Sequence, residues 1–194
     1  FQVPEEGLEH HAEMPDVAGP DGLPDLTDVA PRILEKSPEK MRRYLTTKRA
    51  FEFRPVEAMD FASPEPRPPQ KCVWIKTVDQ LPDKPGLHQN LLAYVSDYEL
   101  LGTSTLPHGL PFGQGRVLMA SLDHALWFHR DVRVDDWLLY AMDSPNSSGA
   151  RGYSRGQFFT RDGRLIASSA QEGLVRVLSE EAAESRRSDP KQQQ

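Results

Sequence analysis

The chain has 194 residues, with 23 basic and 29 acidic side chains and a formal net charge of −6. Because binding to nucleic-acid phosphates requires a basic surface, this charge argues against a general nucleic-acid-binding protein. The single cysteine, Cys72, excludes a disulfide within the chain and fits a reducing compartment, and no apolar run approaches the ~20 residues that cross a bilayer, so no membrane insertion is expected.

The front of the chain is expected to be irregular. Residues 1–48 contain many prolines, each of which fixes φ and removes a backbone hydrogen-bond donor. Within this segment, residues 31–45 are compatible with one or two short helical turns that Pro38 interrupts. A folded domain is expected at residues 49–178, and the charged end at residues 179–194 is expected to be a disordered tail because it has few large apolar side chains.

Two strands and one helix are predicted at the start of the folded domain. Residues 50–57 alternate imperfectly between apolar and polar side chains, and Pro55 confines this strand to an edge or an end of a sheet. Residues 71–78 alternate more regularly. Over residues 87–101, apolar side chains recur at steps of three and four, which predicts a helix with a wide buried stripe that stops near Gly102.

Strand patterns occupy the rest of the domain. Four segments are rich in aromatic, β-branched and small residues, and Asp162-Gly163 between the last two is a strong hairpin signal. One amphipathic helix and a long, mostly antiparallel sheet must cover each other, which predicts an α+β fold. The compact solution is a curved sheet wrapped around one central helix, the hotdog fold. The four predicted strands are residues 116–129, 137–144, 150–160 and 165–177.

The histidines and the cysteine do not form a recognisable metal site. His10 and His11 lie in the irregular front segment, where a solvated pair is the simpler interpretation. The other histidines lack partners at ligand spacing, and Cys72 alone cannot make a thiolate zinc site. We therefore expect no metal and no cofactor.

Ser121, Asp123 and His124 have the side chains of a hydrolase triad. In a continuous strand, however, Ser121 and Asp123 face one side and His124 the other. Neighbours in this arrangement cannot hydrogen-bond in series, so we do not predict a triad here.

Two polar residues stand in apolar surroundings. Asp97 lies within the predicted helix beside Tyr94, Val95 and Tyr98, where an ionised carboxylate costs free energy unless it is paired or solvated. Gln171 lies inside an apolar strand pattern, where a buried amide must find partners. A solvent-facing helix residue and a structural hydrogen bond explain these positions as well as catalysis does, so the residues alone leave the choice open.

Four blocks of sequence carry a family resemblance. They read LLAYVSDYELLGTSTLPHG, ASLDHALWFHR, DDWLLYAMDSPNSSGARGYSRGQFFTRDG and IASSAQEGLVR, in this order along the chain. Together they closely resemble the second half of type II acyl-CoA thioesterases, which are built from two hotdog halves. The front segment, FQVPEEGLEHHAEMP, resembles the linker between those halves.

The resemblance implies an activity and a set of catalytic residues. The family hydrolyses fatty acyl-CoA to a free fatty acid and CoA, using an Asp on the central helix, a Ser or Thr on the next strand and a Gln on the last strand. Local matches place these residues at Asp97 in VSDYELL, Ser121 in MASLDH and Gln171 in SAQEGL. Asp97 would accept a hydrogen bond from the attacking water, while Ser121 and Gln171 would orient that water.

The CoA part of such a substrate carries phosphates, which require cationic partners. Arg151 and Arg155 are four residues apart in a predicted strand and therefore share a face. Together with Arg130 they are candidates for phosphate contacts. Solvated surface arginines are the competing interpretation, because such charges are common at strand edges.

The resemblance also implies partners. A second hotdog half, from the same or another chain, is expected to complete the site, so the protein is expected to form an oligomer. Alternatively, this half is a non-catalytic assembly or acyl-CoA-binding module. Dehydratase chemistry is disfavoured because SDYELL and AQEGL do not resemble its His–carboxylate arrangement. A cytoplasmic location is expected; the family also includes peroxisomal members, but DPKQQQ does not match their Ser-Lys-Leu-type signal.

Overall fold

The computed structural model describes residues 5–28, 34, 42–43, 46–57, 65–110 and 116–183. The elements with defined bounds in the described part are one α-helix, one 3-10 helix and seven strands. In chain order these are β1 (Phe51–Pro55), β2 (Gln70–Thr77), α3 (Pro85–Val95), η1 (Leu101–His108), β3 (Val117–Ser121), β4 (Ala125–Phe128), β5 (Leu138–Ser148), β6 (Arg151–Thr160) and β7 (Leu165–Val177).

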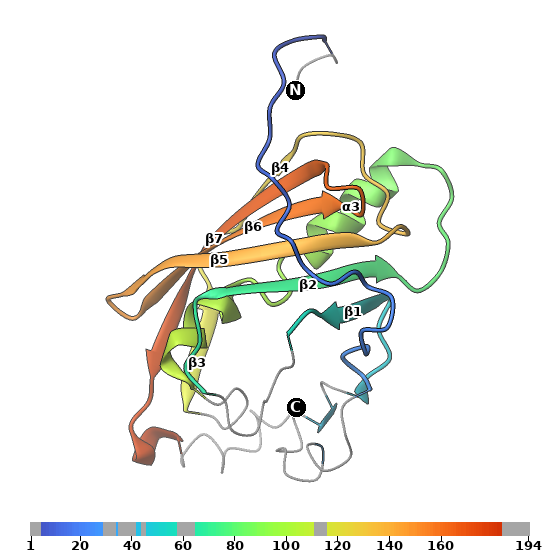
Figure 1. Cartoon of the computed structure of the whole chain (residues 1–194). Coiled ribbons are helices and arrows are strands. Elements are labelled where there is room, and N and C mark those ends of the chain that lie inside the picture. Colours follow the sequence, from blue (N-terminus) through green and yellow to red (C-terminus); the bar gives the residue numbers. More distant parts are fainter. Residues whose placement is uncertain are drawn as a thin grey trace.

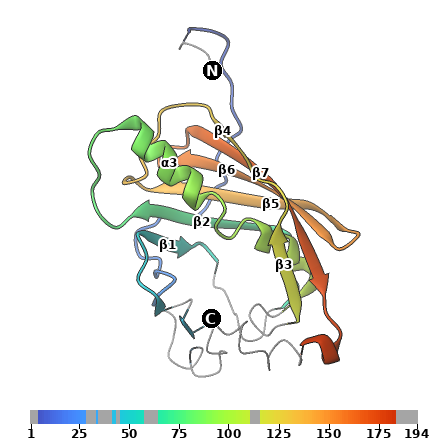
Figure 2. The ribbon, with the colours of Figure 1, turned by 180° about the vertical axis from the view of Figure 1, so that it is seen from behind.

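All seven strands belong to one antiparallel sheet with the order β1-β2-β5-β6-β7-β3, in which β4 also pairs with β7. Figures 1 and 2 show this sheet curving around α3, which lies across its inner face. The predicted α+β arrangement of a curved sheet around one central helix is therefore confirmed. Gly163, in the predicted hairpin between β6 and β7, has a φ of +89°, a conformation that glycine adopts without strain.

Side chains from α3 and the inner face of the sheet form the main core. Leu92 and Val95 of α3 are fully buried against strand residues such as Ile75, Tyr140 and Phe158. These strand residues follow the two-residue period that sends alternate side chains to one face of a sheet. Burial of this apolar surface is the dominant force that holds the helix in the curve of the sheet.

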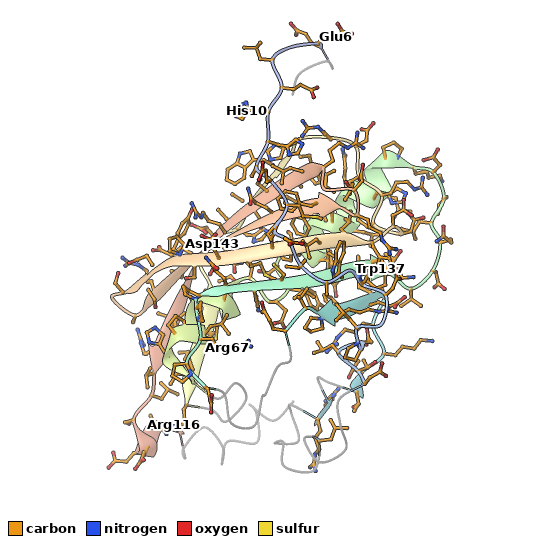
Figure 3. All side chains as sticks on the ribbon, in the orientation of Figure 1. Glu6, His10, Arg67, Arg116, Trp137 and Asp143 are labelled. Atoms are coloured by element: carbon orange, nitrogen blue, oxygen red, sulfur yellow. The ribbon has the colours of Figure 1, made fainter. Side chains whose placement is uncertain are left out.

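The N-terminal segment, residues 5–28, has no helix or strand and crosses the outer face of the sheet (Figure 1). It covers a second apolar cluster that includes Trp74 and Phe159. The Trp74 indole N–H donates to the Ala18 carbonyl oxygen over 2.8 Å. Figure 3 shows Glu6 and His10 beyond the end of the sheet.

The helix ends earlier than the sequence predicts, and Asp97 is not within it. The predicted helix covers residues 87–101, whereas α3 ends at Val95 and is followed by turns up to the 3-10 helix η1. Glu99 has a φ of +66°, a left-handed conformation that a right-handed helix cannot contain. The apolar spacing nevertheless continues because Leu100 and Leu101 remain buried in the new geometry.

The strand predicted at residues 116–129 is two strands, β3 and β4. The backbone N–H groups of Leu122 and Asp123 both donate to the carbonyl oxygen of Glu172, at 2.9 and 3.3 Å. The Asp123 carboxylate in turn accepts the Glu172 N–H at 2.7 Å. The Asp123 side chain thus occupies the donor that a continuous strand would use, and the ladder is interrupted there.

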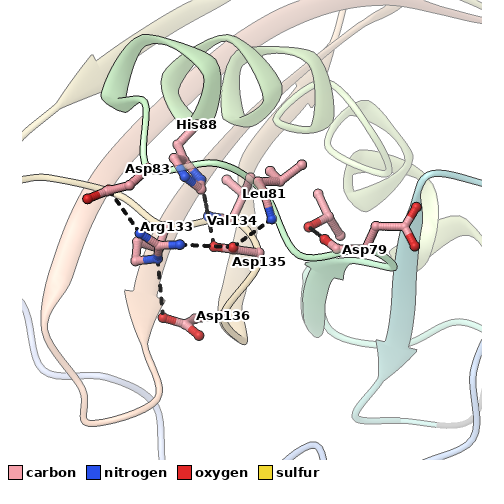
Figure 4. A network of polar contacts seen from close by, with 9 residues as sticks. Asp79, Leu81, Asp83, His88, Arg133, Val134, Asp135 and Asp136 are labelled. Atoms are coloured by element: carbon pink, nitrogen blue, oxygen red, sulfur yellow. Dashed lines mark hydrogen bonds and ion pairs between the residues drawn. The ribbon is translucent and has the colours of Figure 1, made fainter.

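A buried polar network joins the start of α3 to the segment before β5 (Figure 4). The Val134 N–H donates to His88 Nδ1 over 3.2 Å, while the Asp135 carboxylate accepts the Leu81 N–H and pairs with Arg133, both at 3.0 Å. Burial alone would raise the pKa of the Asp135 carboxyl, but the hydrogen bonds from Leu81 and Arg133 hold it below its ordinary value.

The remaining predictions concern the margins of the fold. Most of residues 31–45, where helical turns are predicted, lie outside the described residues, as does 184–194 of the predicted tail. The start of that tail is a helical turn at residues 180–183, with Ala183 buried. In the described part of the chain, no helix has the length and apolar character of a membrane span.

Candidate active site

Asp97 and Gln171 meet, although 74 positions separate them in the sequence. Asp97 lies in the turn after α3, and Gln171 lies on β7 with its side chain on the inner face of the sheet. The Gln171 Nε2 donates to Asp97 Oδ1 over 2.5 Å. Gln171 is 1% exposed, whereas the Asp97 side chain is 58% exposed. The carboxylate is therefore held by a buried amide and remains open to a substrate.

Ser121 lies on the same face as Gln171. Its partner across the β3–β7 pairing is Gly173, two residues along β7 from Gln171, so all three positions face the same side. A Cβ atom on Gly173 would stand 2.3 Å from the side chain of Leu101, so this face of β7 packs against η1. Ser121 itself is exposed, and within the described residues its hydroxyl bonds to neither Asp97 nor Gln171.

The turn that carries Asp97 is held at the residues before it. The Tyr140 hydroxyl donates to the carbonyl oxygen of Ser96 over 2.6 Å, and burial raises the pKa of Tyr140 above its ordinary value, which keeps this donor protonated. On the same residue, Ser96 Oγ donates to the Ala93 carbonyl oxygen over 2.9 Å. Ser96 is fully buried, so these contacts position the backbone from which Asp97 extends.

The residues after Asp97 are held as well. Tyr98 stacks on Phe53, with ring centroids 5.5 Å apart, and burial together with the hydrogen bond between the Tyr98 and Tyr94 hydroxyls raises the pKa of Tyr98 to about 12. Glu99, with its left-handed backbone, pairs with Lys71 Nζ over 2.8 Å. Strained backbone persists only where the surroundings determine it. The Lys71–Glu99 pair is one of the contacts that hold Glu99 in this conformation.

His124 is a member of this site that sequence reasoning missed. Its Nδ1 lies 3.1 Å from Gln171 Nε2 and 4.0 Å from Asp97 Oδ1, and its Nε2 lies 2.8 Å from Ser96 Oγ. Its side-chain hydrogen-bonding partners among the described residues are thus Ser96 and Gln171. In a continuous strand, His124 would point away from Ser121. Because β3 ends at Ser121 and β4 begins at Ala125, His124 lies between the two strands and strand alternation does not determine its direction.

The two arginines predicted on β6 point away from the candidate site. Arg151 and Arg155 alternate with the fully buried Ser154, so they lie on the outer face of the sheet. Arg151 Nε donates to the Glu172 carboxylate over 3.0 Å, and Arg155 forms two hydrogen bonds, of 3.1 and 2.5 Å, with Asp143, which is labelled in Figure 3. Phosphate binding by this pair stays a prediction.

Arg130 lies away from the other two arginines. Its guanidinium donates to the Leu165 carbonyl oxygen over 2.7 Å and lies 3.6 Å from the Glu9 carboxylate. It lines a cavity of about 490 Å³ beneath the N-terminal segment, whose lining includes neither Asp97 nor Gln171. Its contact with a substrate phosphate also stays a prediction.

The sequence matches a family model. Residues 42–174 match the model described as acyl-CoA thioesterase. The chain is 36% identical over 176 residues to acyl-CoA thioesterase 2 of Haemophilus influenzae, covering 91% of this chain and 62% of that protein. It is 32% identical over 178 residues to human acyl-coenzyme A thioesterase 8, covering 88% of this chain and 55% of that protein. The chain thus spans less than two thirds of either relative.

Solved structures agree with these matches. Acyl-CoA thioesterase II TesB2 from Mycobacterium marinum superposes with a TM-score of 0.69 at 37% identity, covering 92% of this chain and 61% of that chain. A protein described as having a hot dog fold, from Alicyclobacillus acidocaldarius, superposes with a TM-score of 0.64 at 18% identity and supports the fold alone. The fold is therefore the predicted hotdog, and the chain belongs to the acyl-CoA thioesterase family.

Proposed function

We propose that this chain hydrolyses fatty acyl-CoA to a free fatty acid and CoA, using a water molecule held by Asp97, Ser121 and Gln171. The observation that carries the proposal is the contact between the exposed Asp97 carboxylate and the buried Gln171 amide, on the face that Ser121 shares. Structural carboxylates are usually paired or solvated at the surface. Asp97 is solvated too, but one of its oxygens is also fixed by a buried amide donor, which sets the direction of the exposed carboxylate.

The proposed reaction is a nucleophilic attack by water. The water oxygen attacks the thioester carbonyl carbon while Asp97 accepts a water proton, and the Ser121 hydroxyl orients the water. The tetrahedral intermediate then collapses, the carbon–sulfur bond breaks, and the leaving thiolate takes up the proton to give CoA and the fatty acid. Positioning the water removes much of the entropic barrier, and a positioned base typically contributes about 10²–10⁴-fold.

The Ser121 hydroxyl is expected to matter for this step, whereas an additional methyl group on the same side chain is not. Ser121→Ala is expected to lower kcat for thiol release from medium- and long-chain acyl-CoA by about tenfold, the loss of one hydrogen bond in the transition state. Ser121→Thr keeps the hydroxyl and should retain most of the activity. Equal rates for all three proteins would contradict the role of Ser121, and no thiol release by the wild-type chain would favour the non-catalytic assembly module.

Three exposed apolar side chains belong to β4 and to the loop before it, at the end of the sheet where β3 and β4 pair with β7. Leu122, Trp127 and Phe128 are 59%, 52% and 41% exposed. An apolar surface next to a strand edge marks a contact with another chain. We propose that residues 49–178 form one hotdog half and that another half, in the simplest case a second copy of this chain, covers this surface.

A charge at Trp127 should weaken this association. Trp127→Lys is expected to raise the dissociation constant by about tenfold or more, because buried aromatic anchors dominate interface energies. The matched control is Val78→Lys, which places the same charge at an apolar residue that is 47% exposed and lies outside this surface. Sedimentation equilibrium measures both. A wild-type chain that stays monomeric, or equal effects of the two variants, would contradict the proposed surface.

A further inference from the structure

The orientation of the Gln171 amide depends on two acceptors. Its Nε2 lies 2.5 Å from Asp97 Oδ1 and 3.1 Å from His124 Nδ1, so both amide hydrogens have a partner. The amide oxygen, Oε1, is buried and has no hydrogen-bond partner among the described residues. A rotation of the amide by 180° would place Oε1 against the Asp97 carboxylate. Since Oε1 has no hydrogen bond that would hold the amide in place, the contacts of Nε2 with Asp97 and His124 must prevent this rotation.

The contacts of Ser96 determine which ring nitrogen of His124 accepts. The Ser96 hydroxyl hydrogen is directed to the Ala93 carbonyl oxygen, at 2.9 Å. Its oxygen is therefore the acceptor in the 2.8 Å contact with His124 Nε2, which must carry a hydrogen. In the neutral ring this leaves a lone pair on Nδ1, directed at the Gln171 amide. The donors run in one direction, from Gln171 to His124 and from His124 to Ser96.

We propose that His124 is a positioning residue that keeps the nitrogen of the Gln171 amide directed at Asp97. The inference rests on the proposed function, in which Asp97 takes a proton from water. Once protonated, the Asp97 carboxyl is a weaker acceptor and its hold on the amide falls. His124 is not consumed in this step and continues to accept the second amide hydrogen. The amide is then still oriented when Asp97 gives its proton up again.

A structural role would work through the other ring nitrogen. His124 also bonds to the fully buried Ser96, which precedes Asp97 in the chain. Two substitutions separate the nitrogens, because the side-chain oxygen of Asn occupies roughly the place of Nδ1, and the terminal amide of Gln reaches roughly the place of Nε2. His124→Asn keeps an acceptor for Gln171, whereas His124→Gln keeps only the group that faces Ser96.

The kinetic test compares these two variants in thiol release from acyl-CoA by the full chain. We expect His124→Gln to lower kcat by about tenfold with little change in KM, the size of one lost orienting hydrogen bond, and His124→Asn to stay within about threefold of wild type. Thermal unfolding of both variants checks that the fold is retained. The reverse order of activities, or equal activities, would overturn the positioning role.

A spectroscopic test does not depend on activity. The ¹⁵N resonances of the His124 ring at neutral pH should show a protonated Nε2 and an unprotonated Nδ1. A protonated Nδ1 in an active chain contradicts the role of His124 and leaves the proposed hydrolysis standing. The expected tautomer in a chain that releases no thiol contradicts the proposed hydrolysis itself. The two failures are therefore distinguishable.

Discussion

Asp97→Asn is expected to lower kcat for acyl-CoA hydrolysis by about 10²–10⁴-fold, the contribution of a positioned general base. The asparagine oxygen can still accept the hydrogen bond that Gln171 Nε2 donates to Asp97 Oδ1, so the local structure should be retained. What is lost is the capacity to take a proton from water. Thiol release under substrate saturation measures the effect.

A matched carboxylate outside the site provides the control. Asp136→Asn makes the same chemical change at a side chain that is 74% exposed and lies 4.0 Å from Arg133. This variant should hydrolyse acyl-CoA at the wild-type rate. If Asp97→Asn is as active as Asp136→Asn while both remain folded by circular dichroism, Asp97 is not the base and the proposed mechanism fails.

Lys71→Met is expected to lower the free energy of unfolding by about 3 kcal/mol, because it leaves a poorly solvated carboxylate without its cation. Lys71 is 5% exposed and Glu99 17% exposed, so water replaces little of the lost interaction. Glu99 also has the left-handed backbone of the turn after Asp97. Urea denaturation of the two proteins, compared at equal slopes, measures the difference.

Two further variants identify the cause of that loss. Lys76 pairs with Glu52 over 3.1 Å, but both side chains are about a quarter exposed, at 26% and 24%. Lys76→Met should therefore cost about 1 kcal/mol or less. Adding Glu99→Gln to Lys71→Met also removes the carboxylate that lost its ion pair with Lys71 and should recover part of the stability. Equal losses of unfolding free energy for Lys71→Met and Lys76→Met would show that the buried pair stabilises the fold no more than the exposed one.

Most of the fold was predictable from local patterns. The two-residue alternation of the strands and the Asp162-Gly163 hairpin depend on nearest neighbours in the chain, which a sequence displays directly. The helix end was predicted wrongly because apolar residues keep their helical spacing through Leu101. The helix ends at Val95, and the turns after it contain the left-handed Glu99, whose carboxylate pairs with Lys71 on β2; this long-range contact leaves no signal in the local pattern.

The candidate site was predictable only in part. Asp97 and Gln171 stood out as polar residues in apolar runs, but the resemblance to a family assigned them a task. His124 was missed because alternation along a continuous strand turns it away from Ser121. The interruption at Asp123, where a carboxylate takes a backbone donor of β7, is a tertiary contact that alternation alone does not reveal.

The path of the N-terminal segment affects how the protein can be shortened. Met14, Val17 and Leu23 cover Trp74 and its neighbours on the side of the sheet that α3 does not reach. A version trimmed to begin at residue 49 would expose that aromatic surface to water and remove the carbonyl that binds the Trp74 indole. The minimal unit for expression therefore starts before Met14, and the fluorescence of the Trp74 indole would report whether the N-terminal segment is in place.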